Sequence, residues 1–254
     1  MAKPTSAPAG PVVVRSGPNV AAPSEAAPNR WRGIPQDERQ AARRRVVIET
    51  GFELLGSLGV AGITVRGVCE TARLNPRYFY ESFDDLDALL VAVFNRTADD
   101  AFAVMVAAVI AVADSDPLTV TRAGLGSFLR HVTEDPRRVQ VLFVEGLGNE
   151  TMSRRRLESM MEMAEFFERV WAEKSELESG NDSVDPILKI AASLIVGGMS
   201  ELVITWMSGR LNVSLDDLIE DASALFVGVG ETANAIAEAR WSSPMKASPK
   251  LRTT

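Results

Sequence analysis

Residues 62–83, GITVRGVCETARLNPRYFYESF, decide the fold of this chain of 254 residues. Thr64 is a favourable N-cap for a short helix that runs to Ala72, and the residues at 73–75 break that helix. Pro76 then starts a second short helix, because the N–H that proline lacks has no partner in a first helical turn. Two short helices joined by a turn of three or four residues form a helix-turn-helix, whose second helix enters a DNA groove about 12 Å wide.

The apolar and polar residues of this stretch are divided in the way that a helix-turn-helix requires. The apolar side chains are expected on the inner face, where they fix the angle between the two helices: Val65, Val68, Ala72, Leu74, Phe79 and Phe83. The outer face of the second helix then presents Asn75, Arg77, Tyr78 and Tyr80. An amphipathic helix is expected before this pair, from Pro35 to the region of Gly59.

The whole sequence predicts an all-α protein of about nine helices, with an N-terminal three-helix helix-turn-helix domain and a larger C-terminal helical domain. Asp84 is expected to cap a long helix that runs to about Ala113. Acid–proline pairs at 116–117, 135–136 and 185–186 each place a capping carboxylate before a proline. Further helices are expected at 117–133, 136–148, 151–178, 186–208 and 215–239.

The domain boundaries follow from these helices and from the composition of the two ends. We expect a disordered tail at 1–34, rich in Pro and Ala, because such a segment cannot bury enough apolar surface to offset its ordering entropy. The helix-turn-helix domain is expected at 35–95, and a ligand-binding and dimerisation domain at 96–240. Residues 241–254, where Ser, Pro and Lys return, are expected to form a second disordered tail.

Composition excludes several classes of protein. One Cys excludes a disulfide framework, and one Cys with one His excludes a zinc site of four nitrogen and sulfur ligands, so no metal and no cofactor is expected. The sequence lacks the apolar block of a secretory signal and any run of 18 apolar residues that would span a membrane. We therefore expect a reduced, cytoplasmic protein without a membrane segment.

The net charge of −7 is distributed unevenly along the chain. Residues 97–254 carry fifteen basic and twenty-four acidic residues, whereas residues 30–45 hold six arginines against Asp37 and Glu38. This asymmetry favours contact with nucleic acid at one end of the chain only, although a solvated helix face has the same composition.

Three pieces of the sequence together resemble a known family: Gly62–Val68 with Ala72, Phe79–Phe83, and Leu86–Leu90. They are similar to the TetR family of transcriptional regulators, and the resemblance is strong over about 35–93 and weaker over 97–240. The resemblance implies an all-helical homodimer that represses transcription and releases operator DNA when a small molecule binds to its larger domain.

The resemblance also implies roles for individual residues of the helix-turn-helix. Thr64 and Arg66 correspond to the start of a helix that meets phosphate in the family, and Tyr80 corresponds to a tyrosine that contacts the DNA backbone. The turn at 76–78 corresponds to residues that read bases, and residues 43–45 lie near a flanking phosphate. The DNA-binding residues predicted in this way are Arg43, Arg44, Arg45, Thr64, Arg66, Arg73, Asn75, Pro76, Arg77, Tyr78 and Tyr80.

Two positions and one turn depart from the family pattern, and the usual Ala-Gly turn is replaced by the residues at 72–75. Ser82 stands where many members have His, and Leu86 stands where many have a Lys that contacts phosphate, while the aspartates at 84–85 add repulsion. Arg73, Arg77 and the basic residues at 30–45 are the candidates to replace those contacts. The departures keep open an alternative, a helical ligand-binding or adaptor protein of the same fold with weak or no specific DNA binding. An enzyme is not supported, because the sequence has no phosphate loop, metal cluster or nucleophile elbow.

The larger domain is rich in Met and aromatic residues, which line adaptable apolar pockets but also fill ordinary helical cores. With the resemblance, this composition predicts an apolar or amphipathic small-molecule effector between the helices at 101–178 and 186–208. The polar groups placed to orient it are His131, Glu145, Asn149 and Glu201. The predicted effector-binding residues are Phe102, Met105, Phe128, Leu142, Phe143, Met163, Phe167, Met199 and Val203.

The last two helices, 186–208 and 215–239, are predicted to form a homodimer interface. They alternate small and apolar residues, which let helix axes approach closely, and two such helices from each chain would make a four-helix interface. A two-fold dimer in turn predicts an inverted-repeat operator of double-stranded DNA.

Overall fold

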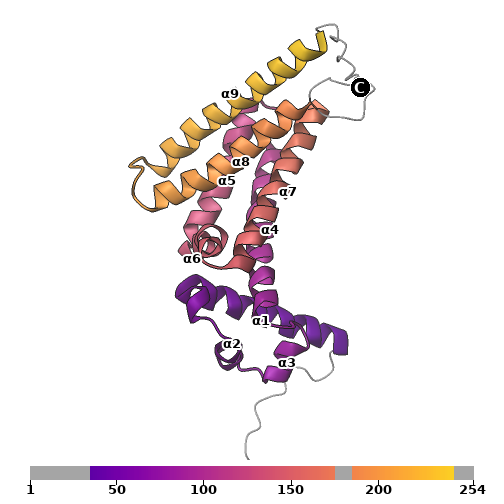
Figure 1. Cartoon of the computed structure of the whole chain (residues 1–254), viewed down its shortest axis with the longest axis vertical. Helices are drawn as coiled ribbons and strands as arrows, with labels where there is room; N and C mark the ends of the chain where they lie inside the picture. Colours follow the sequence, from indigo (N-terminus) through magenta and orange to yellow (C-terminus); the bar gives the residue numbers. More distant parts are fainter. Residues whose placement is uncertain (1–34, 175–184, 243–254) are drawn as a thin grey trace, which may run out of the picture. The chain divides into compact units, whose positions relative to one another are not determined.

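The computed structural model describes residues 35–174 and 185–242, and within these ranges it contains helices and turns but no strand. The expected all-α fold is confirmed (Figure 1). The chain divides into two compact units, residues 1–39 and 40–254, and every described helix except the first turn of α1 lies in the second. The nine α-helices of the described ranges are α1 (Gln36–Leu58), α2 (Val65–Ala72), α3 (Pro76–Tyr80), α4 (Leu86–Ala111), α5 (Pro117–Glu134), α6 (Pro136–Val139), α7 (Glu150–Lys174), α8 (Pro186–Met207) and α9 (Leu215–Ser242).

The acid–proline pairs start helices, as the sequence predicts. The carboxylates of Asp116, Asp135 and Asp185 each accept a backbone N–H from the first turn of α5, α6 and α8. The cap of α4 differs from the expectation, because Asp85 and not Asp84 accepts the N–H of Ala88, at 2.8 Å. The backbone of Asp85 is extended, so the helix begins one residue later than the sequence suggests.

The single helix expected over 136–148 is wrong, because the backbone changes its hydrogen-bonding pattern twice there. The one-turn helix α6 is followed by a π-helical turn, η2 (Gln140–Val144), and then by a 3-10 turn, η3 (Glu145–Leu147). In a π turn the backbone N–H donates to the carbonyl five residues back instead of four, and such turns are frequent at functional sites. The side chains of residues 136–147 therefore point in directions that differ from those in a regular α-helix.

The other helix ends lie within a few residues of the expected ones. α5 and α8 end at Glu134 and Met207, and α9 continues to Ser242, into the region expected to be a tail. The expected tail at 1–34, the expected helix end and loop at 175–184, and the C-terminal tail from 243 lie outside the described residues.

The helices beyond the helix-turn-helix pack as neighbouring pairs (Figure 1). α4 packs along α5 and α7, α5 along α9, and α8 along both α7 and α9. One apolar cluster runs from the helix-turn-helix into these helices, and the buried Leu89, Leu90, Val93 and Phe94 of α4 belong to it. α4 is thus the helix whose position depends on the packing of both parts.

α8 is the one helix in the described ranges that is long and apolar enough, by length and composition, to cross a membrane. A helix packed in a protein core has the same composition, and α8 buries Leu188, Ala191, Ala192, Ile195 and Val203 within this chain.

Candidate nucleic-acid interface

The turn between α2 and α3 is held by backbone hydrogen bonds that close the end of α2. Arg73 adopts the left-handed conformation at φ 53° and ψ 43°, and the Leu74 N–H donates to the carbonyl of Cys69 at 3.0 Å. Leu74 is half-buried against the apolar cluster, so the exposed side chain of Arg73 is turned toward solvent. An arginine at this left-handed position costs more conformational energy than a glycine would.

The short helix α3 is anchored by one buried aromatic ring and presents the others outward. Phe79 is fully buried, and its ring contacts Phe83 and the edge of Tyr80 at centroid distances of 5.7 and 5.4 Å. Tyr80 is 59% exposed and Arg77 is 84% exposed, and Tyr78 is exposed as well. This helix therefore brings together the residues that the sequence assigns to base and backbone contacts.

Both helix caps of the motif leave a hydrogen-bond donor free for a ligand. The Thr64 hydroxyl oxygen accepts the N–H of Gly67 at 3.0 Å, which leaves its O–H able to donate. The Asn75 side-chain oxygen accepts the N–H of Arg77 at 2.9 Å, which leaves its NH₂ group able to donate. Because phosphate oxygens and most base edges are acceptors, these free donors suit DNA.

Glu81 is a residue that the sequence reasoning missed, although it follows Arg77 by one helical turn. Its carboxylate lies 3.2 Å from Arg43 Nη2 and 3.3 Å from Arg77 Nε, and its carbonyl accepts the side-chain N–H of Gln40 at 3.0 Å. Arg43 also stacks on the Tyr78 ring at 4.4 Å, and its side chain is only 14% exposed. The Arg43 side chain thus connects α1 to Tyr78 on α3 and to Glu81 at the end of α3.

The remaining predicted phosphate contacts are more open. Arg44 stacks on the Phe83 ring at 4.7 Å, while Arg45 is exposed on α1. Arg66 is 88% exposed and pairs with Glu70 one turn further along α2, and this hydrogen bond raises the pKa of the Arg66 guanidinium. Ion pairs this exposed contribute little to stability, so phosphate can replace the glutamate at low cost.

The residues that depart from the family pattern, Ser82 and Leu86, are directed toward the core of the protein. Leu86 packs against the apolar cluster, and the Ser82 hydroxyl is buried without a hydrogen-bond partner. The cap of α4 uses Asp85, and Asp84 is exposed. The start of α4 is therefore acidic and apolar, and the exposed basic side chains of this region lie on α1, α2 and α3.

The predicted effector-binding residues lie in the core and at its margin. Leu142, Phe143 and Val203 are buried, while Phe128 and Met199 are half-buried against the same apolar cluster. The other four are half-buried on α4 and α7, and the Phe102 ring meets Phe166 edge-on at 5.0 Å: Phe102, Met105, Met163 and Phe167.

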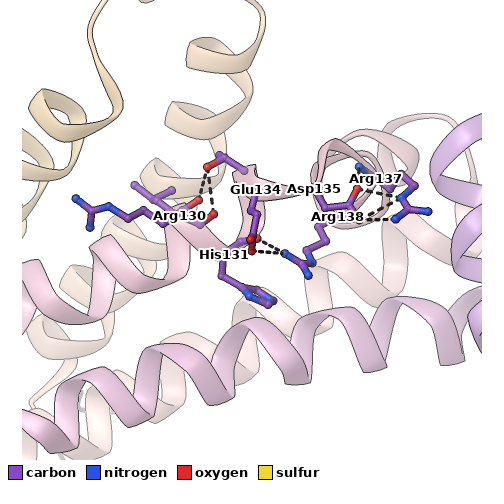
Figure 2. A network of polar contacts seen from close by, with 8 residues as sticks. Arg130, His131, Glu134, Asp135, Arg137 and Arg138 are labelled. Carbon is purple, nitrogen blue, oxygen red and sulfur yellow. Dashed lines mark hydrogen bonds and ion pairs between the residues drawn. The ribbon is translucent and has the colours of Figure 1, made fainter.

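Two grooves are found elsewhere in the described part of the chain, and none of the nine predicted residues lines them. One groove is lined by both polar and apolar side chains, among them Val104, Ser127, His131 and Leu215. Around it, Arg138 donates to the His131 carbonyl at 2.6 Å (Figure 2). Arg130 pairs with Asp216 at 2.6 Å. The His131 Nε2 atom is buried without a hydrogen-bond partner.

The second groove runs between α8 and α9 and is apolar. Small residues form its floor, and large exposed side chains form its sides: Ile190, Leu194, Leu225 and Ile236. These four residues are between 37% and 69% exposed in the single chain. Such a continuous apolar surface is typical of an interaction site.

No family model and no curated protein matches the sequence. Among solved structures, a putative TetR-family transcriptional regulator from Syntrophomonas wolfei matches at a TM-score of 0.60 and 12% identity, covering 75% of this chain and 96% of that one. The transcriptional regulator FadR from Bacillus subtilis, in complex with stearoyl-CoA, matches at 0.58 and 16%, covering 72% and 97%. AibR, in complex with isovaleryl coenzyme A and operator DNA, matches at 0.50 and 19%, also covering 72% and 97%. This chain therefore has the fold of TetR-family transcriptional regulators.

Proposed function

We propose that this protein is a ligand-responsive DNA-binding transcriptional regulator and not an enzyme. The observation that carries the proposal is the exposed face of α3, where Arg77, Tyr78 and Tyr80 surround a helix anchored by the buried Phe79. Residues 35–95 form the DNA-binding domain in this proposal, and residues 96–240 form the ligand-binding and dimerisation domain.

The proposed contacts divide into those that position the protein and those that read sequence. Thr64, Arg66 and Tyr80 contact the DNA backbone, which sets affinity and its dependence on salt. Arg77 and Asn75 reach base edges in the major groove, where a bidentate arginine selects the O6 and N7 acceptors of guanine and an amide NH₂ group donates to a base acceptor. Because Glu81 pairs with Arg77, recognition of a base exchanges one partner of this guanidinium for another.

The proposed homodimer forms through α8 and α9. Burial of Leu194 and Leu225 against a second copy would remove their exposed apolar surface from water, which stabilises association. Closed two-fold symmetry is the most common arrangement for such an interface, and it requires an operator with two inverted half-sites.

The proposed effector is an apolar or amphipathic small molecule that repacks the region of Phe102, Leu142, Phe143 and Val203. The similar structures of FadR and AibR hold acyl-CoA molecules, which makes an acyl thioester the first candidate. Binding there would change the packing of α4, which belongs to both parts of the core. Altered spacing of the two α3 helices would then release a repressor from its operator.

A second candidate function is a helical ligand-binding or adaptor protein that keeps the fold without reading DNA. The acidic, apolar start of α4 favours it, because Leu86 is packed in the core and Asp84 is exposed toward solvent. The DNA experiment below distinguishes the two functions.

The test begins with duplexes enriched from a random pool by the wild-type protein, followed by gel-shift titration of two variants. Arg77→Ala and Tyr80→Phe are expected to weaken binding of the enriched duplex, the first by about 5- to 150-fold if it loses a base contact. Arg154→Ala is the matched control, because Arg154 forms the same one-turn ion pair with Glu150 on α7. Unchanged affinity in both variants would refute the assignment of α3.

A further inference from the structure

The last turns of α1 pack very closely against a segment of the C-terminal helices. Gly56 faces Arg137, and a Cβ at Gly56 would lie 2.5 Å from the Cβ of Arg137 and 3.1 Å from its Cα. The guanidinium of Arg137 lies 5.1 Å from the centre of the Phe52 ring on α1. Glycine is thus required at Gly56 for the two backbones to approach this closely.

A hydrogen bond joins the same two regions at the turn that follows α1. Gly59 has a φ of 69°, and the next residue, Val60, starts the 3-10 turn η1 (Val60–Gly62) that leads into α2. No side chain within the turn caps it, and instead Glu145 Oε2 accepts the Val60 N–H at 2.8 Å. The other oxygen of Glu145 accepts from the Gln140 side chain, which holds the carboxylate in place.

The segment that supplies Glu145 has its other side in the core. Val141, Leu142 and Phe143 of the π turn η2 are all buried, and η2 packs against α4 and α8. A π turn is less favourable than a regular α-helix, so its register is sensitive to the packing of these three side chains. One segment of six residues therefore connects the α4–α8 core to the turn before α2.

We propose that η2 and Glu145 form a second joint between the C-terminal helices and the helix-turn-helix, in addition to α4, and that Glu145 is the positioning residue of that joint. Repacking at Leu142 then moves the Glu145 carboxylate and releases the Val60 amide at the start of the helix-turn-helix. This inference rests on the proposed function, because it describes how an effector signal would reach DNA.

Hydrogen–deuterium exchange of the full-length protein, resolved at the Val60 amide, tests the joint without DNA or effector. Glu145→Ala should speed exchange at Val60 about tenfold or more, because the amide loses a charged acceptor. Glu145→Gln keeps an oxygen that can accept this bond, so exchange should be close to the wild-type rate. Glu220→Ala, which removes a surface ion pair between α5 and α9, is the control and should leave Val60 unchanged.

A second pair of variants tests whether a change of packing in the core reaches Val60 through η2. Each variant removes the same side-chain volume from a different place in the same core. Leu142→Ala should speed exchange at Val60, whereas Leu129→Ala should not, because Leu129 is equally buried but lies on α5. If either protein fails to fold, the pair Leu142→Val and Leu129→Val replaces it. Equal exchange at Val60 in the two variants, or no effect of Glu145→Ala, would overturn the proposal.

The exchange result is independent of the proposed function. A wild-type protein that enriches no DNA sequence would refute the regulator and leave the joint standing. A wild-type protein that binds its operator, with Val60 exchange insensitive to Leu142→Ala, would refute the joint and leave the regulator standing.

Discussion

Leu225 is the most exposed large apolar residue of the groove between α8 and α9, with 69% of its surface open to solvent in the single chain. Complete burial of a leucine side chain is worth about 1.5–3 kcal/mol, so burial of the exposed part is worth about 1–2 kcal/mol per protomer. Two-fold symmetry counts this contribution twice. Leu225→Ala is therefore expected to cost about 2–4 kcal/mol of dimerisation free energy, which weakens the dimer about 30- to 700-fold.

The assay is sedimentation equilibrium of the purified proteins across a range of concentrations. Ile110→Ala is the matched control, because Ile110 is 68% exposed on α4 and lies outside the groove, and its variant should dimerise as the wild type does. Thermal unfolding at low concentration, where only monomer is present, should be nearly unchanged by either substitution. A wild-type protein that is monomeric at every concentration, or a Leu225→Ala protein with the wild-type dimer affinity, would refute the interface.

Three further predictions concern single positions. Phe79→Ala should destabilise the protein by about 3–5 kcal/mol in denaturant unfolding, because it empties the buried anchor of α3; a loss below about 1 kcal/mol would contradict its role. Arg73→Gly should leave the free energy of unfolding unchanged or raise it by up to about 1 kcal/mol, because glycine relieves the strain of the left-handed conformation but loses more backbone entropy on folding. A clear loss of stability would show that the arginine side chain stabilises the turn. The hydrogen bond from Arg137 lowers the pKa of the Asp135 carboxyl. The stabilisation by this ionised carboxylate is therefore present above the unfolded pKa of about 3.9 and is lost as pH falls through the folded pKa. Asp135→Asn should lose less stability than the wild type below about pH 4, and identical acid unfolding curves would exclude the ion pair.

Local signals in the sequence are sufficient for most helix starts and for the helix-turn-helix. Asp116, Asp135 and Asp185 cap their helices because capping depends on the neighbouring residues alone. The choice between Asp84 and Asp85 could not be made in this way, since both are good caps and the packing of Leu86 decides where α4 begins.

Features that depend on distant contacts could not be read from the sequence. The π turn at Gln140–Val144 follows from packing against α4 and α8, and the partner of Glu145 lies 85 residues away. Apolar periodicity places Leu142 and Phe143 on a buried face but does not distinguish the wall of a pocket from ordinary core.

The DNA interface falls between these two cases. The outward row of Arg77, Tyr78 and Tyr80 follows from the helical spacing of the buried Phe79. The ion pair of Arg43 with Glu81 and its stacking on Tyr78 link α1 to α3, and residues 35–38 positions apart in the sequence give no local signal for these contacts.

If this chain reads a DNA sequence with α3, the affinity of the wild-type protein must depend on both the sequence of the duplex and the salt concentration. The measurement compares the duplex enriched from a random pool with a scrambled duplex between about 50 and 200 mM salt. We expect the enriched duplex to be an inverted repeat, to bind at least about 1,000-fold more tightly than the scrambled one, and to lose affinity steeply as salt rises. Equal affinity for both duplexes, or no enriched sequence, would contradict the account and leave the ligand-binding or adaptor protein as the function of this fold.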